Sequence, residues 1–184
     1  MLTSNRCSLW LIAGIVLFAF RAEAAEITAY AGGVNPGSLS INGVETALES
    51  GPIYGFRLRT DFVPHFGMEH TLGFSGDYLF PTNISAVTDA KGFVFNSNLI
   101  LDLPMRNLVP YVTAGVGLVH QYGSENLPLG TQFAFNYGGG LKFPRLIGPL
   151  GLRVDARGYT ATGISSTNLN MFEVSGGVLF SFGR

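Results

Sequence analysis

Charged residues recur at alternate positions in two stretches of this sequence. The two triplets are Arg57, Arg59 and Asp61, and Arg153, Asp155 and Arg157. Successive side chains of a β-strand point to opposite faces, so each triplet lies on one face if its stretch is a strand. Guanidinium and carboxylate groups on one face can line a path for ions, or they can pair and fill a closed interior. The choice depends on the elements that carry them.

Histidine is the other residue type that invites a chemical hypothesis. A hydrolytic site needs a nucleophile, a base and an orienting carboxylate within hydrogen-bond reach. His70 precedes Thr71-Leu72 and His120 precedes Gln121-Tyr122, so neither has a serine two positions further on as a nucleophile. No two of the three histidines share a chelating spacing. We therefore expect no catalytic residues, no metal site and no cofactor.

Composition excludes some classes of protein. Charged residues make up only 12% of the 184 residues, there are 25 glycines, and the net charge is −1. A chain with no net positive charge has no general attraction to phosphates, so we expect no nucleic-acid partner.

The first 24 residues have the pattern of a cleavable signal peptide. Arg6 precedes an apolar run over Leu9–Phe20, and Ala22-Glu23-Ala24 supplies the small residues of a cleavage site. The run is too short for a helix that crosses a bilayer. We expect cleavage after Ala24, which leaves residues 25–184 as one barrel domain without its single cysteine, Cys7.

The remaining chain divides into segments of period two, each long enough for a tilted strand to cross a membrane. We expect eight strands, near 26–34, 51–62, 66–77, 91–102, 108–120, 131–143, 150–160 and 170–182. The segment 150–160 is the clearest, because Leu150, Leu152 and Val154 alternate with Arg153 and Asp155. No membrane-spanning helix remains, and open sheet edges cannot face lipid, so the prediction is a closed, eight-stranded antiparallel transmembrane β-barrel.

The connections between these segments alternate between long and short. Long links at 35–50, 78–90, 121–130 and 161–169 alternate with short turns at 63–65, 103–107 and 144–149. Outer-membrane barrels have short periplasmic turns, longer outer loops and both termini in the periplasm. We therefore favour a membrane barrel over a soluble lipid carrier with the same alternation.

In a membrane barrel the polar rows face inward. The expected lumen charge network is Arg57, Arg59, Asp61, Glu69, Lys142, Arg153, Asp155, Arg157 and Glu173. An eight-stranded barrel is just wide enough for side chains to fill it, which favours a salt-bridged plug over an ion path. A narrow channel remains the alternative.

Four stretches resemble the family of small outer-membrane barrels that includes the OmpA transmembrane domain and OmpX-like proteins. They are Pro110–Leu118 (PYVTAGVGL), Phe135–Lys142 (FNYGGGLK), Leu152–Tyr159 (LRVDARGY) and Val174–Phe182 (VSGGVLFSF). The resemblance implies recognition of the last strand by the barrel-assembly machinery, here through Val178, Phe180 and Phe182. The final Gly183-Arg184 departs from the aromatic ending usual in the family.

Aromatic and acidic residues complete the expected surface. We expect Tyr111 and Phe143 near the periplasmic boundary, and an outer girdle that consists of Tyr54, Phe93, Tyr122 and Phe133. The outer loops carry Glu45, Glu49, Asp77, Asp89 and Glu125 against only Lys91. Such an acidic surface can meet lipopolysaccharide through divalent cations or bind a basic partner, but it is more often simply a solvated face.

Together these features predict an exported, non-enzymatic outer-membrane protein. We expect a monomer surrounded by outer-membrane lipids and lipopolysaccharide, with a structural or surface-interaction role for four outer loops on a plugged barrel. The alternatives are a narrow channel or small-solute porin, and a lipid-A-modifying enzyme.

Overall fold

The computed structural model describes residues 25–41, 44–47, 49–76, 90–123, 130–164 and 167–182. The expected signal peptide, the Gly183-Arg184 ending, and most of the expected links at 78–90 and 121–130 lie outside these ranges. In the described ranges, no helix is long and apolar enough to cross a bilayer.

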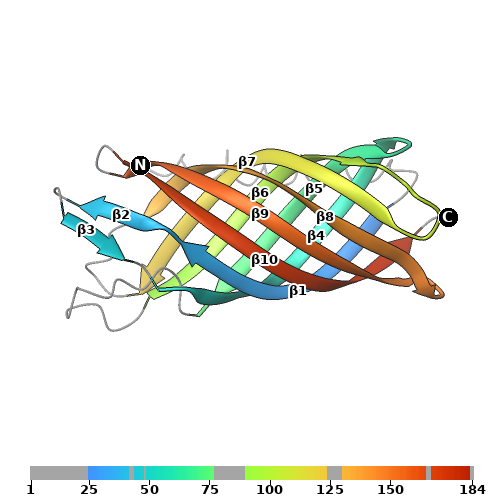
Figure 1. Ribbon diagram of the computed structural model, residues 1–184, viewed down its shortest axis with the longest axis horizontal. Helices are drawn as coiled ribbons and strands as arrows, with labels where there is room; N and C mark the ends of the chain where they lie inside the picture. The colour runs from blue at the N-terminus through green and yellow to red at the C-terminus, as the bar shows by residue number, and fades with distance from the viewer. Residues whose placement is uncertain are drawn as a thin grey trace, which may run out of the picture.

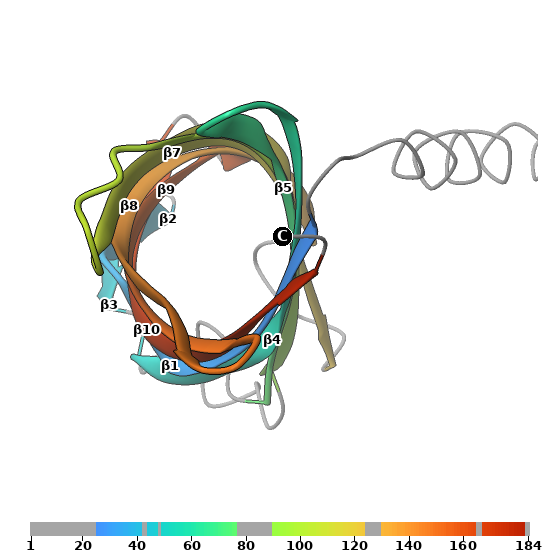
Figure 2. The same cartoon turned by 90° about the vertical axis from the view of Figure 1, so that its right-hand side faces the viewer.

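Eight antiparallel strands close into a barrel (Figures 1 and 2). They are β1 (Ala25–Pro36), β4 (Gly51–Val63), β5 (Phe66–Ser75), β6 (Ala90–Asp102), β7 (Val109–Gly123), β8 (Thr131–Ile147), β9 (Leu150–Ile164) and β10 (Thr167–Phe182). Each strand pairs with its neighbour along the chain, and β1 closes the barrel by pairing with β10. The predicted fold class is thereby confirmed.

The two chain ends and the short turns share one end of the barrel. Ala25 pairs with Phe182 on one side and with Thr60 on the other. The turn at Pro64-His65, the link 103–108 and the turn at Gly148-Pro149 lie at this end as well. We call it the turn end and the opposite one the loop end.

The expected link at 35–50 was wrong in part, because it contains a separate hairpin. Strand β2 (Ser38–Ile41) pairs with β3 (Val44–Ala47) in a two-stranded sheet beyond β1 (Figure 1). The two strands flank Asn42-Gly43 in the sequence, a dipeptide that favours two-residue hairpin turns. The segment is short and polar, which is why it was interpreted as a loop.

The turn expected at 144–149 was also too long. Strand β8 continues to Ile147, with a register irregularity between Phe143 and Ile147, and the chain reverses at Gly148-Pro149. Pro144 lies in this irregular stretch, where its lack of an N–H to donate to a strand partner is accommodated by a bulge. Gly148 has a φ of 59°, which glycine adopts without strain.

The two faces of the wall differ as predicted. Phe56, Leu152 and Val174 are 58%, 50% and 50% exposed on the outer face. Arg57 follows Phe56 in the sequence and Arg153 follows Leu152, and both arginines are buried inside the barrel. An apolar exterior around a charged interior is the reverse of a soluble protein and matches the demands of lipid.

Candidate functional site: the charged lumen

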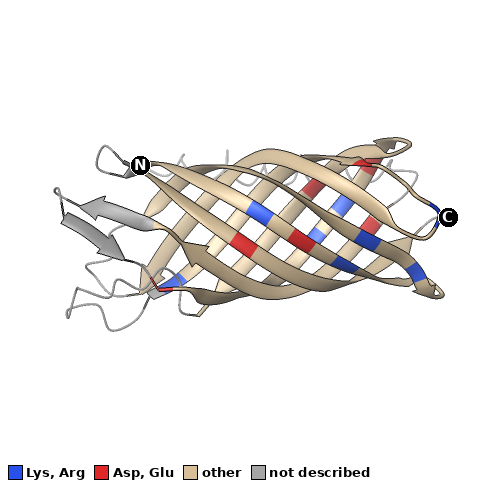
Figure 3. Ribbon diagram, in the orientation of Figure 1, with Lys and Arg blue, Asp and Glu red and all other residues tan. Residues whose placement is uncertain are grey.

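Six charged side chains meet in the middle of the lumen, carried by four different strands. In Figure 3 most of the basic residues, in blue, and acidic residues, in red, lie along the middle of the barrel and toward the turn end. The six residues are Arg57 on β4, Glu69 on β5, Arg153, Asp155 and Arg157 on β9, and Glu173 on β10. Period-two alternation places them inward, and barrel closure brings β4, β9 and β10 within reach of one another. We call this set the central network.

Arg57 on β4 reaches two strands with which β4 does not pair, β10 and β9, the second and third strands from it around the barrel. Its Nη1 donates to Asp155 Oδ2 at 2.6 Å, and its Nη2 donates to Glu173 Oε1 at 2.6 Å. The same Nη2 lies 3.1 Å from Ser175 Oγ. Since 98 and 116 residues separate Arg57 from the two carboxylates, these bonds fix the closed topology rather than a local turn.

Glu69 binds the other two arginines of the central network. Its Oε1 accepts from Arg157 Nη2 at 2.5 Å, and its Oε2 accepts from Arg153. Asp155 also pairs with Arg153 at 2.9 Å and with Arg157 at 3.1 Å. Three guanidinium groups thus face three carboxylates, and the central network carries no net charge.

Three tyrosines belong to the same site, although none of them was among the expected network residues. Tyr159 donates to Glu173 Oε2 at 2.6 Å, and Tyr111 donates to Asp155 Oδ1. The guanidinium carbon of Arg57 lies 3.8 Å from the centroid of the Tyr30 ring, a cation–π arrangement.

The assignment of Tyr111 to a periplasmic girdle was therefore wrong. Its side chain is buried, 2% exposed, and points into the lumen. Position along the strand was the available signal. Val112, Ala114, Val116 and Leu118 form the outward row of β7, so the alternation places Tyr111 on the inward face.

A second group of charges lies at the turn end of the lumen. Arg59 Nε donates to Asp61 at 2.6 Å, and its Nη1 donates to Asp102 at 2.7 Å. Lys142 Nζ donates to Glu26 at 3.0 Å and to Asp102 at 3.1 Å. The carboxylates here are 12–18% exposed, whereas those of the central network are fully buried.

The structure thus places all nine charged residues of the expected network inside the barrel, but in two groups. Arg59, Asp61 and Lys142 belong to the turn-end group, with Glu26 and Asp102 as partners that were not among the nine. Both had the inward parity of their strands, which is the signal that could have added them.

Some polar atoms of the lumen have no protein partner. Neither amide atom of Asn96 has one, and Asn98 Oδ1, Asn136 Nδ2 and the Tyr30 hydroxyl are also unpaired. These side chains are buried, and buried polar groups in folded proteins are satisfied by protein or by ordered water. The wall formed by β6, β7 and β8 therefore presents a place for water inside the barrel.

One possible nucleophile and base meet on the outer wall. His70 Nδ1 lies 2.9 Å from Ser97 Oγ on the neighbouring strand, and the His70 ring stacks on Phe95 at 6.3 Å. The next residue along the chain, Glu69, points into the lumen and binds Arg153 and Arg157 there. A hydrolytic triad needs a carboxylate bonded to the imidazole. The pair has the first two members of a triad on one face, with the adjacent acidic residue on the other.

The remaining expected sites lie on the outer wall. Tyr54, Tyr122 and Phe133 are exposed and Phe93 is half-buried, all on the outer face near the loop end. Val178, Phe180 and Phe182 form an outward row at the end of β10. His120 Nδ1 lies within hydrogen-bond distance of Thr131 Oγ1, at 2.7 Å, and the His120 ring stacks on Tyr122. In the described ranges, no three His, Cys, Asp or Glu side chains are grouped as a metal site.

Fold and lumen together define a class: an eight-stranded β-barrel of the outer-membrane kind, with an interior packed by its own side chains. No family model matches the sequence, and no curated protein matches it. Solved structures do match.

Three of these structures are outer-membrane barrels. Neisserial surface protein A aligns with a TM-score of 0.64 at 14% identity, over 86% of this chain and 97% of that one. The outer membrane protein OprG of Pseudomonas aeruginosa aligns with a TM-score of 0.62 at 12% identity, over 89% of this chain and 98% of that one. The outer-membrane enzyme PagL aligns with a TM-score of 0.53 at 16% identity, over 84% of this chain and 98% of that one. The likeness shows the fold, and this chain has the architecture and the apolar exterior of an outer-membrane protein.

Proposed function

We propose that this chain is a non-enzymatic outer-membrane protein whose lumen is closed. Its role is to hold the segments at the loop end on a rigid cylinder, where they meet the cell's surroundings. The central network is the observation that carries the proposal. Its six charged side chains cross the lumen between four strands, are fully buried, and balance in charge.

A closed lumen follows from the energetics of these ion pairs. Each charge has left water, a loss that only close pairing and further hydrogen bonds offset. Separating Arg57 from Asp155 and Glu173 to admit ions would expose three charges to a narrow space. Removal of one partner from a buried pair costs about 3–5 kcal/mol, so the open arrangement is rarely populated.

Planar-bilayer recording tests the closed lumen. Purified full-length protein should give no stable unitary currents above those of the empty bilayer. Stable unitary currents whose conductance or ion selectivity changes in an Arg57→Ala or Arg153→Ala variant with a correctly folded barrel would instead support the second candidate, a narrow channel. The unpaired atoms of Asn96, Asn98 and Asn136 favour that candidate, because they imply water in the lumen.

The non-enzymatic part of the proposal has a separate test. PagL shows that this architecture can carry an enzyme, and His70 with Ser97 is the arrangement here that comes nearest to a catalytic pair. Counted from the turn end, His70 is the fifth residue of β5 and Ser97 is the sixth residue of β6. Both therefore lie near the middle of their strands, away from the membrane borders where the ester groups of lipids lie. We expect lipid A mass spectra of cells with wild-type protein and with Ser97→Ala to be identical. A change in acyl number that requires Ser97 would contradict the proposal.

The expected partners also belong to this proposal. The outward apolar rows would contact outer-membrane lipids and lipopolysaccharide, and Val178, Phe180 and Phe182 would be recognised during assembly. Both chain ends would face the periplasm, because the turn end is the end with short connections. We propose a monomer. The expected acidic outer surface rests mostly on Asp77, Asp89 and Glu125, which lie outside the described residues.

A further inference from the structure

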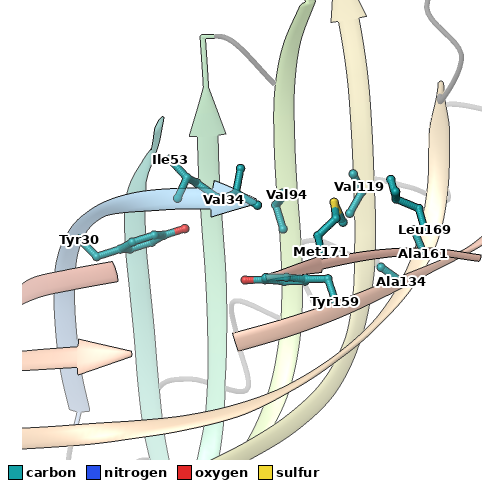
Figure 4. Close-up of a cluster of buried hydrophobic side chains, with 10 residues drawn as sticks. All are labelled: Tyr30, Val34, Ile53, Val94, Val119, Ala134, Tyr159, Ala161, Leu169 and Met171. Atoms are coloured by element: carbon teal, nitrogen blue, oxygen red, sulfur yellow. The ribbon is translucent and has the colours of Figure 1, made fainter. Parts of the chain in front are cut away.

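The lumen contains an apolar layer in addition to its charges. Figure 4 shows buried side chains that converge from separate strands. With Tyr30 and Tyr159, the cluster consists of Val34, Ile53, Val94, Val119, Ala134, Ala161, Leu169 and Met171. These eight residues come from β1, β4, β6, β7, β8, β9 and β10, which are seven of the eight barrel strands. We call them the apolar layer.

The apolar layer lies between the central network and the loop end. In β1, Val34 follows Tyr30, which packs on Arg57, by four positions toward the loop end. Ile53 precedes Arg57 by four positions in β4, which runs in the opposite direction. Met171 precedes Glu173 by two positions in β10, which is also antiparallel to β1. All three shifts point to the same end of the barrel.

The two layers resist permeation for different physical reasons. The central network fills the lumen, yet the asparagines beside it have unpaired polar atoms that can bind water. Aliphatic side chains offer water no hydrogen bonds, and an apolar constriction in a pore blocks ions because water leaves it. The apolar layer would therefore exclude ions even if the central network opened.

We propose that the apolar layer is a second barrier to ions and water, in series with the central network and independent of it. This inference rests on the proposed closed lumen and adds its construction. Rearrangement of the salt bridges alone then leaves the barrel closed. Conduction requires both layers to be breached.

Four variants separate the two barriers. The network variant combines Glu69→Ala with Arg157→Ala, which removes a carboxylate and a guanidinium that pair at 2.5 Å and so keeps the charge balanced. The layer variant combines Ile53→Ser with Met171→Ser. Its matched control, Ile53→Val with Met171→Leu, changes the same side chains but keeps them apolar. The fourth variant combines the network and layer changes.

Each purified full-length protein is inserted into planar bilayers after its folded fraction has been measured by far-ultraviolet circular dichroism and by the mobility shift on heating. If the serine variant folds poorly, Val94→Thr with Val119→Thr replaces it, since threonine has nearly the shape of valine but can bind water. We expect wild type, control, network variant and layer variant all to stay silent. Only the combined variant should give unitary currents.

Two results would overturn the inference while leaving the proposed function intact. The first is a network variant that conducts as well as the combined variant, because the apolar layer would then block nothing. The second is a combined variant that is folded and silent, because the barrier would then lie elsewhere. Currents through the wild type would contradict the proposed closed lumen itself.

Discussion

Arg57 on β4 and Asp155 on β9 meet at 2.6 Å across the lumen, although 98 residues separate them. The same guanidinium holds Glu173 on β10 and packs on the ring of Tyr30 on β1. One side chain therefore ties together four consecutive strands of the wall, β4, β1, β10 and β9, around the seam where the barrel closes. The stability of the closed barrel should depend on it more than on most residues.

Arg57→Met should lower the free energy of unfolding by about 3–5 kcal/mol, because Glu173 and Asp155 lose a buried cation. Urea unfolding in lipid vesicles measures this loss. The double variant Arg57→Met with Glu173→Gln should recover about 1 kcal/mol of it, since one uncompensated carboxylate is removed as well. Equal stability of wild type and Arg57→Met would show that the central network contributes little to closure.

Two adjacent glycines of β10 should differ in their tolerance of alanine. A Cβ on Gly177 would lie 2.6 Å from the backbone oxygen of Ala29, whereas the nearest atom to a Cβ on Gly176 is Arg153 O at 3.8 Å. Gly177→Ala should cost about 1–3 kcal/mol through overpacking of the wall. Gly176→Ala should stay within about 0.5 kcal/mol of the wild type. Vesicle unfolding of both variants measures the difference, and equal losses would contradict the register between β1 and β10.

Leu152→Arg should impair insertion, because an arginine near the bilayer midplane on the lipid face costs about 2–4 kcal/mol. Leu152 is half exposed on the outer wall, opposite the buried Arg153. The folded fraction after refolding into vesicles provides the measurement, with Leu152→Phe as the control that preserves apolarity. Normal folding of Leu152→Arg would mean that this face does not contact hydrocarbon.

Phe182→Ser should reduce accumulation in the outer membrane without a matching loss of folding in vitro. Phe182 is the last described residue, outward on β10 and 4.6 Å from Phe180 between ring centroids. If the row is read by the assembly machinery, its loss affects the cell and not the purified chain. Equal losses in cells and in vesicles would assign Phe182 a purely structural role, and Phe182→Tyr serves as the aromatic control.

Most of the barrel could be predicted because alternation is a local property. Leu150, Leu152 and Val154 against Arg153 and Asp155 specify a strand and its two faces without any knowledge of its partners. The long and short connections then order the strands. The hairpin of β2 and β3 and the position of the turn at Gly148-Pro149 were not predicted, because the segments around them lack the long apolar alternation of the barrel strands. The dipeptide Asn42-Gly43 was the available signal for the hairpin.

The interior was predictable in part, because polarity identifies only the inward residues that are polar. Val34, Ile53 and Val94 also face inward, but they resemble the residues of the outer wall. At these positions the inward residue is apolar, so polarity no longer distinguishes the inner face of the strand from the outer one. The division of the charges into two groups was likewise hidden, because it depends on the stagger between strands rather than on any one strand.

The central claim is that the apolar rows face lipid while the charged rows fill the lumen. Trp10, the only tryptophan of the sequence, lies in the expected signal peptide, so single tryptophans can report on chosen positions once Trp10 is replaced by phenylalanine. The tryptophan fluorescence of the Phe56→Trp and Leu152→Trp variants should be quenched strongly by lipids brominated along their acyl chains and weakly by iodide in solution. Strong iodide quenching with little effect of the brominated lipids would contradict the membrane-spanning barrel.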